Sequence, residues 1–225
     1  MKRKKGLSPI IDQDSKILIL GTFPSQSSRE TKRYYENKNN RFWKVICDFI
    51  GITLVPEDYN EKVKLLLKNN IAVWDLIDEC ETADSKDSSI DNPVFHDLKS
   101  FLAEYPSIEF ILLNGMTTTQ KMYKKHFKDM PIPFVAAQST SSASGRLDET
   151  LWNGALLLKS PTYKKAVEYY VKLLCNNPPY KKTVNNNKIE YKFNDYALTR
   201  TCTYNGICRR NFEPVLLAAI QLKLI

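Results

Sequence analysis

The chain has 225 residues, enough for one domain with a full core or for a domain with a smaller appendage. Its apolar fraction of 43% and charged fraction of 26% are typical of a protein that folds in water, and no apolar run approaches the roughly 18 residues of a membrane span. The composition therefore excludes a membrane-spanning protein, and the formal net charge of +8 favours an anionic partner.

The positive charge is distributed unevenly. Residues 1–15 carry four basic and two acidic side chains, and residues 176–225 carry eight and three. Residues 26–45 hold six basic residues against two acidic ones. A charge run alone usually marks a solvated helix face, but this one surrounds an asparagine-rich stretch that leads into Phe42 and Trp43. We therefore favour a surface that faces a polyanion such as DNA.

The first half of the chain begins with a basic N-terminal arm, residues 1–15. No apolar stretch follows its basic start, so we expect no secretory signal. Short apolar runs predict buried strands at 16–21 and 71–75. Between these strands, amphipathic spacing predicts helices at 41–52 and 59–69.

The second half continues the alternation of helix and strand. A helix is expected at 93–105, with Asn92 as its N-cap and Pro93 in its first turn. The elements that follow are a strand, a helix and a strand, at 108–115, 116–127 and 132–138.

The remaining sequence closes the series and then changes character. Residues 148–174 predict two helices that are broken near Pro161. We assign residues 16–175 to one domain and residues 176–225 to a basic C-terminal appendage. In the appendage, alternation at 183–193 indicates a hairpin, and the last residues indicate an apolar helix.

Strands that alternate with helices predict an α/β fold, a three-layer α/β/α arrangement around a central, mainly parallel four-stranded sheet. Such sheets bind ligands at the carboxyl ends of their strands. The polar residues there lie at 21–25, Asp75, 114–115 and 138–146. Each could be a simple connecting loop, but four of them beside a basic patch favour a cleft.

Several kinds of chemistry lack their sequence signatures. No GxSxG motif, Walker loop or dinucleotide glycine pattern is present, and no cluster has metal-ligand spacing, so we expect no metal and no cofactor. His96 and His126 are expected at helix surfaces or ends. The five cysteines lack CxxC spacing and indicate reduced thiols, in the cytoplasm of a bacterium or the nucleus of a eukaryote.

The expected cleft is rich in Asn, Ser and Thr, which cannot supply a strong base or nucleophile. Such groups can position a water molecule or a phosphate. This suits a reaction in which a sugar develops oxocarbenium character, such as the cleavage of a base from deoxyribose.

Five stretches carry a specific resemblance, in order and spacing, to the hypoxanthine-DNA glycosylase-like branch of the uracil-DNA glycosylase superfamily. The resemblance covers roughly residues 15–172. The stretches are GTFPSQSS (21–28), YYENKNNRFW (34–43), VWDLIDECETADSKDSSI (73–90), LLNG (112–115) and QSTSSA (138–143).

The resemblance implies a role for particular residues. Asn40 would be the catalytic asparagine that places a water against the anomeric carbon, while Asn37 and Asn39 are turn residues. Asp75 could accept a hydrogen bond from a ring N–H of an extruded base, or it could cap the following helix. The first wall of the base pocket would comprise Gly21, Thr22, Phe23 and Pro24.

The resemblance also implies contacts with DNA. Ser139, Thr140 and Ser141 match a loop that grips phosphate, and Arg146 and Arg41 are expected to reach the DNA. The family has prolines where this chain has Gln138 and Ser142, so we expect this loop to be less rigid. Phe42 and Trp43 are expected to pack in the core rather than to stack on a base.

The leading hypothesis is a monofunctional DNA glycosylase that removes a deaminated base, hypoxanthine in preference to uracil, and leaves an abasic site. A nucleic-acid-binding module that has lost catalysis and a hydrolase of free nucleosides remain open. The sequence does not indicate the oligomeric state.

Overall fold

The computed structural model of the protein describes residues 3–84, 87–158, 180–185, 188–193, 215, 218–219 and 221. The chain divides into two compact units, residues 1–149 and residues 150–225. The domain boundary that we expect at 175/176 lies outside the described residues and stays a prediction.

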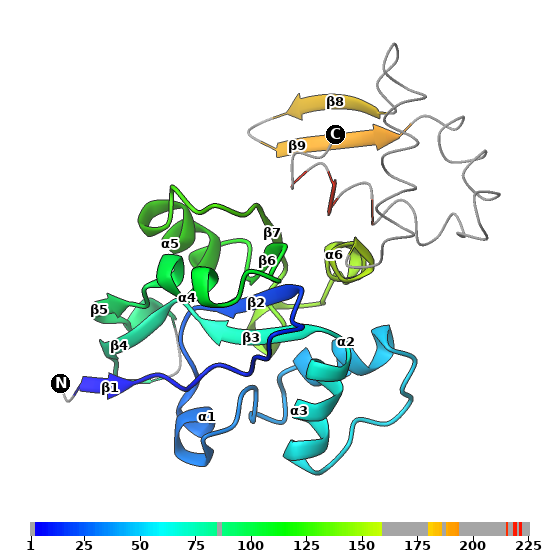
Figure 1. Cartoon of the computed structure of the whole chain (residues 1–225). Coiled ribbons are helices and arrows are strands. Elements are labelled where there is room, and N and C mark those ends of the chain that lie inside the picture. Colours follow the sequence, from blue (N-terminus) through cyan, green and yellow to red (C-terminus); the bar gives the residue numbers. More distant parts are fainter. Residues whose placement is uncertain are drawn as a thin grey trace. The chain divides into compact units, whose positions relative to one another are not determined.

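A four-stranded parallel sheet forms the centre of the first unit (Figure 1). Its strands lie in the order β3-β2-β6-β7, and all four were expected from their apolar runs. The sheet confirms the predicted α/β fold with its mainly parallel four-stranded centre. The bounds are β2 Ile17–Gly21, β3 Ile71–Asp75, β6 Phe110–Asn114 and β7 Phe134–Ala137.

The sheet is covered on both faces, which is why its strands are apolar runs rather than alternating patterns. Every residue of β2 is buried. In Figure 1, α2 and α3 lie on one side of the sheet, and α4 and α5 lie on the other. The helices are α1 Gln26–Thr31, α2 Phe42–Phe49, α3 Tyr59–Lys68, α4 Leu98–Glu104 and α5 Thr118–His126.

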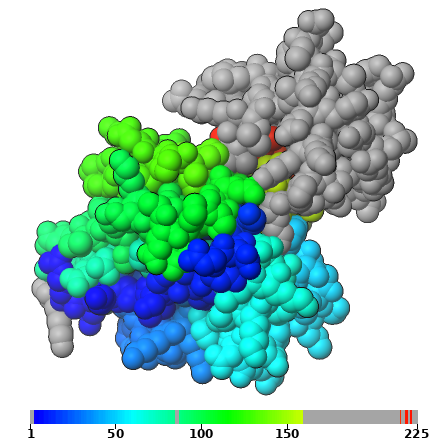
Figure 2. Space-filling view, viewed as in Figure 1, coloured from blue at the N-terminus to red at the C-terminus, as the bar shows by residue number. Residues whose placement is uncertain are grey.

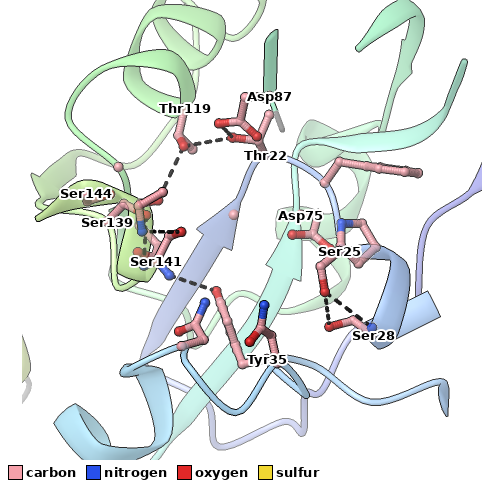
Figure 3. A pocket seen from close by; sticks show the side chains of 18 of the residues that line it. Thr22, Ser25, Ser28, Tyr35, Asp75, Asp87, Thr119, Ser139, Ser141 and Ser144 are labelled. Carbon is pink, nitrogen blue, oxygen red and sulfur yellow. Dashed lines mark hydrogen bonds between the residues drawn. The ribbon is translucent and has the colours of Figure 1, made fainter. Parts of the chain in front are cut away.

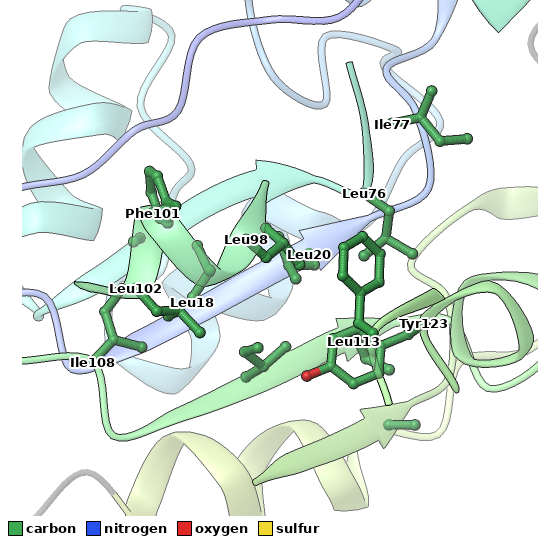
Figure 4. Close-up of a cluster of buried hydrophobic side chains, with 14 of the residues drawn as sticks. Leu18, Leu20, Leu76, Ile77, Leu98, Phe101, Leu102, Ile108, Leu113 and Tyr123 are labelled. Atoms are coloured by element: carbon green, nitrogen blue, oxygen red, sulfur yellow. The ribbon is translucent and has the colours of Figure 1, made fainter. Parts of the chain in front are cut away.

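A cluster of buried hydrophobic side chains lies where α4 and α5 pack on the sheet (Figure 4). Leu18 and Leu20 of β2 point into it, as does Leu113 of β6. Leu98 and Phe101 of α4 meet them from above the sheet. On the opposite side, Phe42 and Trp43 at the start of α2 are buried, as the sequence predicts.

A second, antiparallel sheet was not expected from the sequence. It has the order β1-β4-β5, with bounds Arg3–Lys5, Ile77–Glu81 and Asp91–Phe95. The residues expected as a basic arm are thus joined to the domain through β1, and Ile10 also forms a β-bridge with Val73.

The helix expected at 93–105 begins later than predicted. Asn92 and Pro93 belong to the exposed strand β5, where a proline is tolerated because an edge strand leaves some N–H groups unpaired. The helix α4 begins at Leu98, and Asp97 caps it by accepting a hydrogen bond from the Ser100 N–H at 3.0 Å. His96 was expected at a helix surface or end. It lies just before Asp97, the N-cap of α4, but its side chain is only 11% exposed and packs at a tilt on the Trp74 ring.

The connections of the sheet create a crevice. From β2 the chain crosses to β3 on one side, and later to β6 on the other side of β2. The loops after β2 and β6 therefore diverge at the carboxyl edge of the sheet, which is the switch point at which open α/β sheets bind ligands.

The described residues of the second unit include one helix, α6 Thr150–Leu158, and a hairpin of β8 Tyr180–Asn185 and β9 Lys188–Phe193. The hairpin confirms the alternation seen in the sequence. Residues 215, 218–219 and 221 are helical, as expected for the apolar end of the chain. The predicted break at Pro161 and three of the cysteines (Cys175, Cys202 and Cys208) lie outside the described residues.

Two properties of the described residues bear on the expected setting of the protein. Cys47 and Cys80 are both buried free thiols. No described helix combines the length and the apolar character that crossing a bilayer requires.

Candidate active site

A polar cavity of about 340 Å³ lies at the carboxyl edge of the parallel sheet (Figure 3). This volume is at the lower end of the range typical of ligand pockets. The loops that follow all four parallel strands contribute to it, as the sequence predicts. Its lining includes Gly21, Thr22, Phe23, Pro24, Asn40, Asp75, Asp87, Asn114, Ser139 and Ser141.

Gly21 and Asp75 are neighbours in the sheet and form the floor of the cavity. They are paired in the register of β2 and β3, so the Asp75 side chain lies over the Gly21 backbone. A Cβ atom at position 21 would come within 2.5 Å of the Asp75 Oδ1 atom. Glycine is therefore required at this position for the carboxyl group to occupy its place.

The Asp75 carboxyl group is almost fully buried, with 4% of the residue exposed, and its Oδ2 atom has no hydrogen-bond partner. Burial raises the pKa of Asp75 to about 7, because the charged form loses its hydration. The nearby Tyr34 hydroxyl lowers this pKa, and the charge of Asp87 raises it further. Near neutral pH, a substantial fraction of Asp75 is a neutral acid that can donate a hydrogen bond.

A second carboxylate, Asp87, lies across the cavity from Tyr35 (Figure 3). Its Oδ2 atom accepts a hydrogen bond from the Thr22 hydroxyl at 3.1 Å. The same hydroxyl is 2.9 Å from the Thr119 hydroxyl, which donates to the Asn114 carbonyl oxygen. Burial also raises the pKa of Asp87, while its hydrogen bond from Thr22 lowers it.

Asn40 is held in place by the start of helix α2. Its Oδ1 atom accepts a hydrogen bond from the Phe42 N–H at 2.9 Å, and its own N–H donates to the Asn37 carbonyl oxygen at 2.8 Å. The Asn37 side chain accepts from the Asn39 N–H, so Asn37 is a turn residue, as expected. The turn presents the amide group of Asn40 at the cavity wall.

Tyr35 forms another wall in a backbone conformation that is unusual for a large residue, with φ of 56°. Its ring stacks on Phe42 with the ring centres 3.7 Å apart. Its hydroxyl accepts a hydrogen bond from the Asn114 Nδ2 atom at 3.1 Å. These contacts offset the cost of the left-handed backbone, which is about 1–3 kcal/mol.

Asn114 also clamps the loop after β7. Its Nδ2 atom donates to the Thr140 hydroxyl at 3.0 Å, and its Oδ1 atom accepts from the Thr140 N–H at 2.9 Å. Thr140 is completely buried. Its side chain therefore supports the loop from inside, and the DNA contact predicted for Thr140 is not retained.

Arg41 braces the same loop from the α2 side. Its guanidinium group donates to the carbonyl oxygens of Thr140, Ser141 and Gly145. Its backbone N–H adds a fourth bond, to the Thr140 oxygen at 3.0 Å. Arg41 does not line the cavity, and these contacts make it a support for the loop. The DNA contact predicted for Arg41 stays a prediction.

Gln138 is one of the two residues that led us to expect a less rigid loop, and its side chain spans the loop. Its Nε2 atom donates to the carbonyl oxygens of Ser144 and Arg146, each at 2.9 Å, and its Oε1 atom accepts from the Asp148 N–H at 2.7 Å. The expectation of a less rigid loop, based on the missing prolines, overlooked these cross-links.

The remaining predicted residues fall into two groups. Phe23, Pro24, Ser139 and Ser141 line the cavity together with Asn40 and Asp75. Arg146 is exposed and does not line it, so its contact with DNA stays a prediction.

Sequence reasoning missed Asp87 and Tyr35 as members of the site, and it placed Asn114 at the cleft without giving it a role. A signal for each was present, because all three lie in stretches that carry the family resemblance. Their side-chain contacts join segments that are far apart in the sequence, so the spacing of motifs alone does not assign them a role.

The cavity contains groups that can donate and accept hydrogen bonds. It offers one carboxyl group that is partly protonated near pH 7, a second carboxylate, the amide of Asn40 and several hydroxyl groups. Within the described residues, no group of three or more His, Cys, Asp or Glu side chains could hold a metal ion.

Known proteins resemble this chain in sequence and in structure. A hypoxanthine DNA glycosylase of Methanosarcina acetivorans is 30% identical over 146 residues, which cover 65% of this chain and 91% of that protein. One of Methanosarcina barkeri is 28% identical over 113 residues, covering 50% and 72%. No family model matches the chain.

A solved structure shows the same fold. It is a solution NMR structure of a candidate uracil DNA glycosylase from Methanosarcina acetivorans, with a TM-score of 0.56 and 30% sequence identity. The match covers 63% of this chain and 87% of that one.

We predict that Asp75→Asn changes how stability depends on pH. The native pKa of about 7 lies above the unfolded value, so the native state binds more protons and wild-type stability falls as pH rises from about 4 to 7. The variant cannot ionise and should lose less stability between pH 5 and pH 8. Thermal unfolding measures the melting temperature of the variant minus that of wild type. This difference should rise by about 4 °C or more from pH 5 to pH 8. The exposed Asp129→Asn variant is the control, and equal shifts in both variants would contradict the assignment.

We also predict that Arg41→Ala destabilises the protein, because it removes the brace of the loop at 138–146. Hydrogen bonds from a charged group are worth about 1.5–3 kcal/mol, so the free energy of unfolding should fall by roughly that amount. Urea denaturation measures it. Arg146→Ala, at an exposed side chain on the same loop, should stay within about 0.5 kcal/mol of wild type. If Arg41→Ala has the same free energy of unfolding as wild type, the hydrogen bonds of Arg41 do not stabilise the loop.

Proposed function

Because the chain belongs to the hypoxanthine-DNA glycosylase branch of the uracil-DNA glycosylase superfamily, we propose that it removes hypoxanthine, and secondarily uracil, from DNA. It would be a monofunctional enzyme that hydrolyses the N-glycosidic bond and leaves an abasic site. The observation that carries this proposal is that Asn40 and Asp75, from segments far apart in the sequence, line one cavity. The active-site roles given below are part of the proposal.

Asn40 would position the water. Its Oδ1 atom already accepts from the Phe42 N–H, which fixes the plane of the amide and leaves a second lone pair free to accept from a water molecule. The water oxygen forms a bond to C1′ of the deoxyribose as the bond from C1′ to the base nitrogen breaks. The electron pair of that bond leaves with the base, and a proton from the water is released.

Asp75 would read the extruded base. In hypoxanthine a ring N–H stands beside a carbonyl oxygen, and uracil carries the same arrangement. A protonated carboxyl group can accept from such an N–H and donate to the neighbouring oxygen at once. Donation to the base would also stabilise the negative charge that develops on it as it leaves.

Neither His96 nor His126 lines the cavity, so Asp75 would be the group that donates to the departing base. The Asp75 Oδ2 atom is buried and unpaired, so a base that entered the cavity would supply its missing partner. Gly21 supports the proposal because it alone leaves room for the carboxyl group.

DNA would meet the protein at the rim of the cavity. Ser139 and Ser141 line it from the loop after β7, and their hydroxyl groups could contact the phosphates on either side of the extruded nucleotide. Extrusion of a base costs a few kcal/mol and least at a mispair, which favours deaminated bases.

We predict that Asn40→Ala lowers the single-turnover rate of hypoxanthine release at least about a hundredfold, the scale of one electrostatic group in an active site. Affinity for the same duplex should be unchanged, because the variant removes a water ligand and not a DNA contact. Abasic-site formation measures the rate, and fluorescence anisotropy measures the affinity.

Asn39→Ala is the matched control, since Asn39 is exposed, lies next to Asn40 and does not line the cavity. It should retain the wild-type rate. If Asn40→Ala releases the base as fast as wild type, the proposed role of Asn40 is wrong. If wild type releases no base from any damaged duplex, the proposed function fails as a whole.

The role of Asp75 as a donor predicts a pH profile. The neutral form is lost as pH rises through about 7, so the single-turnover rate should fall about tenfold between pH 6 and pH 8. Asp75→Asn should be slower and should show no such fall, because an amide does not titrate in this range. A wild-type rate that rises with pH would show that the ionised form is the active one.

A further inference from the structure

A groove lined by basic residues lies beside the candidate active site and belongs to no part of it described so far. It consists of two adjoining hollows of about 710 and 480 Å³, which share Lys5 and Arg29. Lys32 lines the first hollow, and Arg3 and Lys4 line the second. We call these five cationic residues and the two hollows the basic groove.

Some charges of the basic groove are engaged within the protein, and others are free to bind a partner. The Arg29 guanidinium group donates to the Pro24 carbonyl oxygen and lies over the Phe23 ring. Its acidic lining residues are Asp78 and Glu30, so cations outnumber anions five to two. Arg3 pairs with Glu79 at 3.1 Å. In the described part of the chain, the exposed side chains of Lys5 and Lys32 have no ion-pair partner.

The fold holds these cations in fixed positions. Strand β1 pairs with β4 in register from Arg3 to Lys5, and the Gly6 N–H donates to the Asp78 carbonyl oxygen at 2.6 Å. A side chain at position 6 would approach the Ile77 oxygen to 3.0 Å, so the glycine allows the chain to pass this closely. The basic residues at the start of the chain are therefore fixed to the domain through strand β4.

Helix α1 connects the basic groove to the cavity. Ser25, its N-cap, and Ser28 line the cavity, whereas Arg29, the residue after Ser28, and Lys32, the C-cap, line the groove. Tyr34 lines both. Figure 2 shows the N-terminal segment, in dark blue, directly beside the lighter blue of α1. Lys5 and Lys32 of the groove are exposed.

We propose that the basic groove binds the phosphodiester backbone of the DNA strand that flanks the extruded nucleotide. This inference rests on the proposed function, because it takes DNA to be the molecule that enters the cavity. The groove would extend the interface from the cavity rim across α1 to β1.

The arrangement of the cations favours a polymer over a small anion. A phosphate ion or a nucleotide is held by donors that converge on one point, whereas these cations are spread along two hollows on two segments of chain. Lysines that are exposed and unpaired match the phosphates of a backbone, which are contacted one at a time and irrespective of sequence.

The test is the double variant Lys5→Gln/Lys32→Gln in the full chain, with an undamaged duplex of about 20 base pairs as the probe, titrated at several salt concentrations. The logarithm of the affinity falls linearly with the logarithm of the salt concentration, and each lost phosphate contact should make this slope less steep by about 0.9. Two contacts should therefore weaken binding at 0.1 M salt by about tenfold to sixtyfold.

The matched control is Lys64→Gln/Lys68→Gln, which removes two exposed lysines from α3 towards the amino end of the strands, away from the cavity. This control should keep the wild-type slope. At saturating enzyme, the rate of base release by Lys5→Gln/Lys32→Gln should stay within about twofold of wild type, because neither lysine contacts the cavity.

Wild-type affinity and slope in Lys5→Gln/Lys32→Gln would overturn the proposal, and so would an equal loss in the control. These readouts use undamaged DNA and need no catalysis. A wild-type protein that binds DNA through the basic groove but releases no base would contradict the proposed function and leave this inference standing.

Discussion

The buried carboxyl group of Asp75, lying over the backbone of Gly21, is the contact on which the site depends. The register of β2 and β3 brings the two residues side by side at the carboxyl edge of the sheet. Because position 21 lacks a Cβ atom, the carboxyl group fits there and loses its water. Loss of hydration then raises its pKa towards neutrality, and so gives the cavity a hydrogen-bond donor that the residue type alone would not suggest.

The rest of the site is built from loops that hold one another in place. Asn114 at the end of β6 joins Tyr35 on one side to Thr140 on the other. Arg41 ties the start of α2 to the loop after β7. Polar side chains buried in such networks are costly unless every one is paired, so these residues fix a single arrangement of the loops. Loops at the end of a sheet can in this way hold catalytic groups in position.

In the first unit, acidic and basic side chains lie at different depths. The interior of the cavity carries the carboxyl groups of Asp75 and Asp87, while cations lie outside it, in the basic groove. An acidic interior can accept hydrogen bonds from the N–H groups of a neutral base. The same interior repels phosphate. A basic exterior suits the backbone to which that base is attached. On the proposed function, this separation would favour a base that has left the helix over the phosphates on either side of it.

The sequence by itself determined the features that depend on local pattern. Apolar runs marked all four parallel strands, and the Asn-rich stretch before Phe42 marked the turn that presents Asn40. The order of the motifs predicted the family and placed Asn40, Asp75 and the first loop at one edge of the sheet. Periodicity and turn residues act over a few positions, so they can be read without knowing what lies opposite them.

Only the tertiary structure decided what depends on neighbours that are distant in the sequence. Pro93 became part of an edge strand because β4 was there to pair with β5. Thr140 was buried because Asn114, 26 residues away, bonds both its N–H and its hydroxyl. The pKa of Asp75 and the alignment of Lys5 with Lys32 follow from burial and long-range pairing. A sequence pattern does not contain these, because the free energy of a buried charge or a cross-strand contact is set by its surroundings in space.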